Sequence, residues 1–235
     1  MGKRMLGGLL LVVCLLGLGG CVFGSVDEMY ALPKSSEAYV NLQAKINEEK
    51  GTGEYIAPLN GENRQTIQLV DVDEDGLQEA VAFFRDADAD TPLRIVIFKQ
   101  DDQGEYQVYA RIQGVGSEID SIEYVNLGGA GESDVLVSWQ AGSSLRTLVG
   151  YTITDGQPTE IMRSAYDRYL TADLDGDGQE EVVLAQAEEE SSSTRIEYYD
   201  SRDGVLTLTA TSPLSDGTTD ISSWSAGWLE ETVPA

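Results

Sequence analysis

The sequence contains no histidine. This absence excludes Ser-His-Asp catalysis and zinc sites built on histidine, and it removes the side chain that most often acts as a general base near neutral pH. Any enzyme mechanism of this chain would therefore have to work without histidine.

Basic residues are scarce in the 235-residue chain, which has 15 Lys and Arg against 41 Asp and Glu, for a formal net charge of −26. Such a surface repels nucleic acid and anionic lipid, and it attracts cations. A soluble acidic exterior that faces a salty medium accounts for much of this charge. Nucleic acid is accordingly not an expected partner.

An apolar run near the N-terminus predicts a secretory signal over residues 1–20. Lys3 and Arg4 precede this run, which spans 5–18, and small residues lead to Cys21. The run is too short for a typical membrane-spanning helix. The stretch Leu-Gly-Gly-Cys ending at Cys21 resembles the lipobox of bacterial lipoproteins, which implies a lipid on Cys21 and an extracytoplasmic position at the bacterial cell membrane. An ordinary signal peptide or an uncleaved anchor is the alternative.

Cysteine offers little else, because the only other one, Cys14, lies inside the predicted signal. Once Cys21 carries a lipid, the mature part has no thiol for a disulfide bond or for nucleophilic catalysis. Stability outside the cytoplasm must then come from packing and from bound metal.

Residues 21–34 are predicted to form the lipidated cysteine and a tether, and residues 35–51 an amphipathic helix of about four turns. Ser35 and Ser36 offer an N-cap, and Gly51 stands where a C-capping glycine is expected. The apolar residues that recur every four positions are Ala38, Leu42 and Ile46. This helix is expected to pack on the folded domain or to hold it away from the membrane.

From residue 65 onward, short alternating or apolar runs are separated by turn residues, which is typical of antiparallel β-structure. The predicted strands span 80–84, 94–99, 106–112, 119–126, 134–139, 145–153, 166–172, 181–185, 195–199 and 205–211, with a further short strand near Ile161. The predicted fold class is therefore all-β over residues 65–235.

Two stretches of this region, 71–79 and 173–181, share the pattern D-x-D-x-D-G-x-x-E. Carboxylates at alternate positions repel one another unless a cation lies between them, and a hard cation such as Ca²⁺ takes six to eight oxygens. We interpret both stretches as structural calcium loops, with backbone carbonyls as ligands at position seven. The predicted ligands are Asp71, Asp73, Asp75, Leu77, Glu79, Asp173, Asp175, Asp177, Gln179 and Glu181.

The acidic loops differ from an EF-hand, which needs a bidentate Glu at position twelve and helices on both sides. Position twelve is Ala82 in the first loop and Leu184 in the second, and both lie in predicted strands. Gly76 and Gly178 are expected to allow the backbone reversal that brings the ligands together. The alternative is that Asp-Gly turns are simply good turns with solvated acids, but two matching copies between strands favour calcium.

A third stretch, 126–134, occupies the equivalent place between the two acidic loops. The copies start at 71, 126 and 173, and about four short strands per period is the size of a propeller blade. Gly128 and Ala130 stand where the acidic loops have carboxylates, so this copy is expected to keep the turn without the metal. A fourth unit begins near residues 220–228, which predicts a truncated or open array.

The repeated acidic loops resemble the FG-GAP/VCBS repeat of integrin-α-like β-propellers over residues 65–212, although no FG-GAP tripeptide precedes them. This resemblance implies propeller blades, calcium in the loops and a cell-surface role in adhesion or ligand binding. With the lipobox and the helix, the order of segments also looks like that of small lipoproteins of Gram-positive bacteria. We therefore predict a partial array of β-propeller-like blades.

The function predicted from these features is that of a membrane-anchored, non-catalytic binding, adhesion or scaffold module. Its expected partners are the membrane, through the lipid, and an extracellular carbohydrate or protein. Trp139, Trp224 and Trp228 could form a platform for such a ligand, but tryptophans in strands are more often core residues. The adjacent pair Tyr198 and Tyr199 is expected to be exposed, with the two rings on opposite faces of a strand.

The alternative is a calcium-dependent, polysaccharide-active enzyme, either a lyase or a glycosidase. A glycosidase needs two carboxylates that flank a sugar, one with a raised pKa, and a chain with 41 acids contains such pairs by chance. A lyase needs a cluster of lysine, arginine and tyrosine side chains, and the sequence brings none together. A third possibility is a lipoprotein that serves a membrane partner in sensing or envelope assembly.

Overall fold

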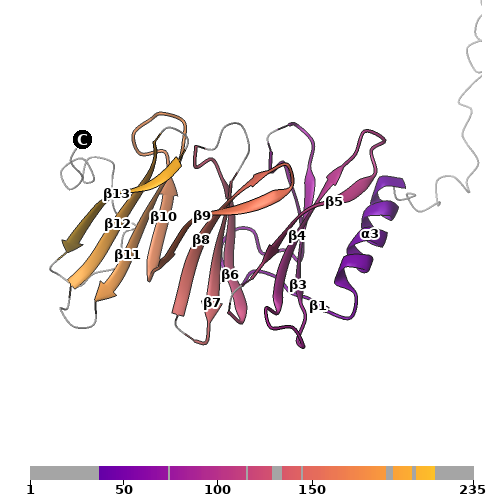
Figure 1. The fold of residues 1–235 in the computed structure, drawn as a ribbon, viewed down its shortest axis with the longest axis horizontal. Coiled ribbons are helices and arrows are strands. Elements are labelled where there is room, and N and C mark those ends of the chain that lie inside the picture. Colours follow the sequence, from indigo (N-terminus) through magenta and orange to yellow (C-terminus); the bar gives the residue numbers. More distant parts are fainter. Residues whose placement is uncertain are drawn as a thin grey trace, which may run out of the picture. The chain divides into compact units, whose positions relative to one another are not determined.

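Thirteen β-strands and one helix make up the part of the chain that the computed structural model describes (Figure 1). The described residues are 37–73, 75–114, 116–128, 134–143, 145–188, 193–202 and 205–214. The predicted signal, Cys21, the tether, Trp224, Trp228 and the expected fourth unit lie outside them. The all-β class predicted from the sequence is confirmed.

The helix and strands have the following bounds: α3 (Glu37–Lys50), β1 (Glu54–Tyr55), β2 (Ile67–Val70), β3 (Glu79–Arg85), β4 (Leu93–Gln100), β5 (Tyr106–Gln113), β6 (Glu118–Val125), β7 (Asp134–Ala141), β8 (Leu145–Thr154), β9 (Gln157–Ala165), β10 (Arg168–Ala172), β11 (Glu181–Glu188), β12 (Ser193–Arg202) and β13 (Val205–Leu214). The sequence did not predict β1, and it predicted only a short strand where the nine-residue β9 lies.

Three antiparallel sheets follow one another along the chain. The first sheet contains β2 to β5, with the two-residue β1 added beside β3. The second has the order β6-β7-β8-β9, and the third has the order β10-β11-β12-β13. The predicted copies at 71, 126 and 173 therefore each start between the first and second strands of a meander of four sequential strands. The interpretation of these meanders as blades of a partial propeller-like array stays a prediction.

The first sheet buries both of its faces, which explains why β3 and β4 read as continuous apolar runs rather than alternating ones. On β3, Val81 and Phe83 belong to a core shared with the second sheet, whereas Ala82 and Phe84 belong to a core shared with the helix. Burying one such large side chain stabilises the fold by about 1.5–3 kcal/mol. The hydrophobic pattern therefore holds the first two sheets together.

The helix α3 confirms the prediction for residues 35–51 where these are described. The helix lies beside β5 of the first sheet (Figure 1). Leu42 and Ile46 are buried against this sheet, and Ala38 packs at the edge of the same cluster. Gly51 has φ of +53°, and its amide donates to the Asn47 carbonyl oxygen at 3.2 Å, as a C-capping glycine does. Within the described residues, no helix is both long and apolar enough to cross a membrane.

A second core joins the second and third sheets, with Leu136 and Leu148 on one side and Val182 and Leu184 on the other. Trp139 is 1 % exposed and lies in the core shared by the first two sheets, so its expected place in the core is confirmed. This packing fixes the ends of β2, β3, β10 and β11, and those ends carry the two acidic loops.

Candidate metal centre

The two acidic loops occupy equivalent places in the first and third sheets. The first joins β2 to β3, and the second joins β10 to β11. In each loop, the acid at position nine is also the first residue of the following strand, and Glu79 and Glu181 are both 1 % exposed. The strand pairing therefore carries a buried carboxylate to the base of each loop.

In the first loop, three carboxylates accept hydrogen bonds from backbone amides of the same loop. The Val72 amide donates to Glu79 Oε2 at 2.8 Å, and the Gly76 amide donates to Asp71 Oδ2 at 2.9 Å. The Leu77 amide donates to Asp75 Oδ1 at 2.8 Å. These bonds fold the loop back on itself, with its acids pointing inward.

The second loop repeats these bonds at every equivalent position. The Leu174 amide donates to Glu181 Oε2 at 2.6 Å, and the Gly178 amide donates to Asp173 Oδ2 at 3.1 Å. The Gln179 amide donates to Asp177 Oδ1 at 2.8 Å. The two loops therefore share the hydrogen bonds made by the amides at positions two, six and seven.

Glycine at position six makes this conformation possible in both loops, as predicted. Gly76 has φ of +87° and Gly178 has φ of +89°, a left-handed region that costs other residues roughly 1–2 kcal/mol. An added Cβ would meet no atom within 4 Å at either position, so the requirement comes from the backbone angle alone. The sharp reversal lets positions one, three and nine converge.

Three carboxylates converge in each loop, with one oxygen of each within 4.8 Å of the others. The first set is Asp71, Asp73 and Glu79, and the second set is Asp173, Asp175 and Glu181. Each set could hold a metal ion. The other predicted ligands, Asp75, Leu77, Asp177 and Gln179, are not part of these clusters, and their roles as ligands stay predictions.

The first cluster contains buried carboxylate oxygens that have no hydrogen-bond partner among the described residues. Asp71 Oδ1, Asp73 Oδ1 and Glu79 Oε1 are all buried and accept no hydrogen bond from the described residues. An unsatisfied buried acceptor costs roughly 1–3 kcal/mol, and more when it is charged. Native proteins seldom leave such groups without an ion or water. A hard cation would satisfy all three oxygens at once.

The pKa values of the two position-nine glutamates reflect this burial. Burial raises the pKa of Glu79, against the opposing effect of the hydrogen bond from the Val72 amide. Burial raises the pKa of Glu181 to about 7, and the nearby Asp175 and Asp200 carboxylates add to the shift. Both glutamates are therefore poorly stabilised as anions in the protein alone, and a bound cation would stabilise them.

Lys99 on β4 reaches the first loop, and sequence reasoning missed it. Its ammonium donates to Asp73 and lies 3.0 Å from Asp75 Oδ2. The hydrogen bond to Asp73 raises the pKa of Lys99, so the ammonium stays charged. The hydrogen bond from the Leu77 amide lowers the pKa of Asp75. The first loop thus contains a positive charge of the protein's own.

The stretch 126–134 keeps part of the same turn. The Leu127 amide donates to Asp134 Oδ2 at 3.1 Å, which matches the bond between positions two and nine in the acidic loops. Asn126 also contacts the second acidic loop: its side-chain amide donates to the Gly178 carbonyl at 3.3 Å, and its backbone carbonyl accepts from the Glu180 amide at 2.6 Å. Residues 129–133 lie outside the described residues, so the loss of metal here stays a prediction.

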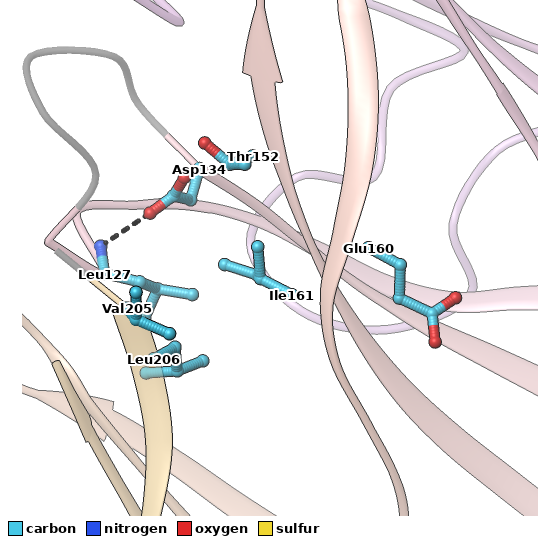
Figure 2. Close-up of a pocket in the computed structure, with 7 residues that line it drawn as sticks. All are labelled: Leu127, Asp134, Thr152, Glu160, Ile161, Val205 and Leu206. Carbon is cyan, nitrogen blue, oxygen red and sulfur yellow. Dashed lines mark hydrogen bonds between the residues drawn. The ribbon is translucent and has the colours of Figure 1, made fainter. Parts of the chain in front are cut away.

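A mostly apolar cleft of about 290 Å³ lies where the second and third sheets meet (Figure 2). The residues that line it are Leu127, Asp134, Thr152, Glu160, Ile161, Val205 and Leu206. Figure 2 shows that Glu160 carries its carboxylate away from Asp134, and this carboxylate pairs with Arg163 instead. The cleft therefore offers an apolar surface rather than a pair of catalytic acids.

A polar pocket of about 170 Å³ brings together tyrosine and arginine side chains that are dispersed in the sequence. Tyr166 shares a hydrogen bond of 2.5 Å with Ser138, and Arg146 lies 4.0 Å from the buried Asp120. Tyr169 donates to Glu123 at 2.6 Å. The sheets bring arginine and tyrosine side chains together here from distant parts of the chain, but no lysine among the described residues lines the pocket, so the lysine, arginine and tyrosine trio that the sequence did not show is not found in it either.

The tyrosines of this pocket are poor bases. Burial raises the pKa of Tyr166 to about 12, and burial together with the nearby Glu123 carboxylate raises the pKa of Tyr169 further. Both phenols therefore stay protonated near neutral pH, and each can donate and accept a hydrogen bond. Tyr169, for example, donates to Glu123 and shares a further hydrogen bond of 2.9 Å with Ser121. The pocket offers polar groups that could bind a ligand, and its tyrosines are not phenolate bases at this pH.

Tyr198 and Tyr199 were expected to be exposed, but both are half-buried. Tyr198 packs with Val183 and Ile196, and Tyr199 packs at the edge of the core between the second and third sheets. The two rings do lie on opposite faces, as strand geometry requires, but neither forms an open platform. The predicted exposure was wrong because both faces of β12 are covered.

Comparison with known proteins gives only distant structural likenesses. No protein family matches the chain, and no curated protein matches its sequence. The exotype rhamnogalacturonan lyase YesX is 14 % identical over 67 % of this chain and 35 % of its own, with a TM-score of 0.38. The rhamnogalacturonan lyase PL11 of Bacillus licheniformis is 14 % identical over 63 % and 34 %, with a TM-score of 0.39.

A Xanthomonas protein related to type IV secretion systems is 12 % identical over 65 % of this chain and 63 % of its own, with a TM-score of 0.34. The chain spans about a third of the length of the two lyases. What the chain itself shows is an all-β protein with two acidic loops that share a hydrogen-bond pattern, each of which could hold a metal ion.

Proposed function

We propose that the chain is a calcium-stabilised β-repeat protein that acts as a binding or scaffold module at the bacterial cell surface. The observation that carries the proposal is the pair of acidic loops, in which three carboxylates converge around a buried glutamate. In the first loop, three buried oxygens lack any hydrogen-bond partner among the described residues. The metal is structural, since it joins the start of a strand to the loop before it.

The donor set favours calcium over other common metals. Every side chain in the two clusters offers oxygen, which suits hard cations and does not select zinc or copper. Magnesium demands near-ideal octahedral geometry and keeps several waters, whereas calcium accepts flexible sets of carboxylates and carbonyls. The proposed carbonyl ligands, Leu77 and Gln179, stand at position seven of each loop. Extracellular calcium modules bind with dissociation constants of about 10⁻⁴–10⁻³ M, which suffices outside cells.

The cellular setting is proposed from the sequence alone. The lipobox-like stretch at Cys21 supports a lipid anchor, and the resemblance to FG-GAP/VCBS repeats supports an adhesive or ligand-binding role. The proposed partner is an extracellular carbohydrate or protein. A surface as acidic as this one favours a ligand that is neutral, basic or bridged by calcium.

The alternative of a polysaccharide-active enzyme has a structural candidate in the pocket of Arg146, Tyr166 and Tyr169. The raised pKa values of the two tyrosines weigh against a lyase base. The position of Arg146 near Asp120 also leaves its charge partly neutralised. We therefore propose a non-catalytic role.

Isothermal titration of the full chain with calcium tests the metal proposal. We expect saturable binding in the millimolar range or tighter, with its loss in the double variant Asp73→Ala plus Asp175→Ala. A matched control is Asp101→Ala, because Asp101 also holds a tight turn by accepting from the Gln103 and Glu105 amides, each at 3.0 Å. The control should bind calcium like the parent. Absence of binding to the parent would mean that the acids only form turns.

Incubation with acidic polysaccharides tests the choice between binding and catalysis. The proposal predicts calcium-dependent retention of the protein on a polysaccharide or protein ligand without a change in that ligand. Release of unsaturated sugar products, lost in Tyr166→Phe or Tyr169→Phe, would establish the enzyme alternative instead.

A further inference from the structure

The two acidic loops differ in the residue that faces them from the next strand of the sheet. Ala80, directly after Glu79, pairs with Phe98 of β4, and Val182, directly after Glu181, pairs with Tyr199 of β12. The residue after Phe98 is Lys99, and the residue after Tyr199 is Asp200. Equivalent positions therefore carry opposite charges.

In the first loop, a lysine ammonium contacts two of the aspartates. The Lys99 ammonium donates to Asp73 and lies 3.0 Å from Asp75 Oδ2, with a side chain that is 28 % exposed. The same ammonium is 5.7 Å from the centre of the Tyr109 ring. A divalent ion among Asp71, Asp73 and Glu79 would have this ammonium as a close neighbour.

In the second loop, a carboxylate takes that place. Asp200 follows Tyr199, which pairs with Val182 directly after Glu181, so Asp200 lies across from Glu181 on the neighbouring strand, and its side chain is only 17 % exposed. Arg202 pairs with Asp200 at 3.5 Å from an exposed position. Among the described residues, no lysine or arginine forms an ion pair with Asp173, Asp175, Asp177 or Glu181. The second loop thus has five neighbouring carboxylates and no cation inside it.

Each cluster also contains a buried glutamate. Glu79 and Glu181 are both 1 % exposed, and in each one Oε2 accepts the loop amide described above. In the first loop, Glu79 Oε1 is buried without a hydrogen-bond partner among the described residues. Both glutamates belong to the clusters in which they converge with the loop aspartates.

We propose that the second loop is the stronger calcium site, because Asp200 of β12 adds a carboxylate beside it. In the first loop, the Lys99 ammonium weakens calcium binding by placing a competing positive charge among the acids. This inference rests on the proposed function, since it assumes that both loops can bind calcium. Its physical basis is Coulomb's law: charges a few ångströms apart at a partly buried site interact by several times thermal energy. Lys99 opposes a second cation, whereas Asp200 attracts one.

The first test is calcium titration of the full chain and two single variants. The parent should show one stronger and one weaker site, at least about tenfold apart in dissociation constant. Lys99→Met should strengthen the weaker site by about tenfold and leave the stronger one unchanged. Asp200→Asn should weaken the stronger site by a similar factor. Lys99→Gln, which removes the charge but keeps a hydrogen-bond donor, serves as a second variant if Lys99→Met does not fold.

Terbium luminescence assigns the sites to the loops. Terbium replaces calcium at oxygen sites, and a nearby tyrosine sensitises its emission. Tyr109 lies beside the first loop, through its contact with Lys99. Tyr198 lies beside the second loop, because it packs against the same hydrophobic cluster as Leu174 of that loop. At substoichiometric terbium, Tyr198→Phe should remove most of the sensitised emission, whereas Tyr109→Phe should remove little. In Lys99→Met, the contribution of Tyr109 should increase.

The outcomes separate this inference from the proposed function. Two equal calcium sites that neither Lys99→Met nor Asp200→Asn changes would overturn the inference and leave calcium binding in place. Emission lost with Tyr109→Phe rather than Tyr198→Phe would overturn it as well, by placing the stronger site in the first loop. Absence of calcium binding in the parent and in both variants, with unchanged circular dichroism, would overturn the proposed function itself.

Discussion

The second acidic loop and the stretch 126–134 close with the same hydrogen bond but depend on different partners. In both, the amide at position two donates to the carboxylate at position nine: Leu174 to Glu181, and Leu127 to Asp134. The second acidic loop then directs Asp173 and Asp175 toward that carboxylate. The stretch 126–134 instead contacts the second acidic loop, where the Asn126 side-chain amide donates to the Gly178 carbonyl oxygen.

This difference indicates that the turn can form without the cluster of three carboxylates. The carboxylate at position nine accepts from a backbone amide at the start of the loop, and that role needs no metal. The carboxylates at positions one and three complete a cluster that could hold a cation. An acid at position nine is therefore expected to stabilise both kinds of loop, but its contribution to the free energy of unfolding should depend on calcium only in the acidic loops.

The largest expected effect follows from removing the position-nine acid. In saturating calcium, Glu181→Ala should lower the free energy of unfolding by about 4 kcal/mol, because it leaves the Leu174 amide unsatisfied and removes a metal ligand. Asp134→Ala should cost about 1–3 kcal/mol, from the Leu127 amide alone. Urea denaturation with calcium and with chelator measures both changes.

The chelator provides the control for this comparison. The cost of Glu181→Ala should shrink by about 2.7 kcal/mol when calcium is removed from a hundredfold excess over its dissociation constant, while the cost of Asp134→Ala should not change. Glu181→Gln refines the test, because the amide oxygen can still accept from Leu174 while the charge is lost. Equal calcium dependence at positions 134 and 181 would contradict the separation of turn and metal.

A smaller effect is expected from the glycines that allow the two turns. Gly128 has φ of +86°, and an added Cβ would overlap the side chains of Gln179 and Ser201. Gly178 has nearly the same φ, with no atom within 4 Å of an added Cβ. Gly128→Ala should therefore destabilise the fold by about 3 kcal/mol, against about 1 kcal/mol for Gly178→Ala. Thermal or urea unfolding in calcium measures the two costs, and a larger cost at Gly178 would show that the stretch 126–134 does not pack on the second loop as described.

Much of the fold was predictable because local patterns determine it. The spacing of Leu42 and Ile46 predicted which face of the helix is buried, and the apolar and alternating runs predicted most of the strands of the three antiparallel sheets. The positive φ angles of Gly76 and Gly178 followed from their place in each loop. These features depend on residues within about ten positions of one another, so the sequence displays them directly.

The residues of the candidate site that the sequence did not predict come close to the loops through pairing between strands. Lys99 and Asp200 meet the loops only because β4 and β12 pair in register with β3 and β11, about twenty positions after each loop's glutamate. Asp120, Arg146 and Tyr166 meet in one pocket for the same reason. Aligning the repeats and marking charge at the residue after the paired position would have found the contrast between Lys99 and Asp200.

The most direct test of the account is thermal unfolding of the full chain in saturating calcium and in chelator, beside the double variant Asp73→Ala plus Asp175→Ala. If both loops hold structural calcium, the parent should melt several degrees higher in calcium, since each occupied site adds about 2.7 kcal/mol at a hundredfold excess over its dissociation constant. The double variant should show almost no shift. A parent that melts at one temperature in calcium and in chelator would contradict the central claim, and the acidic loops would then be turns alone.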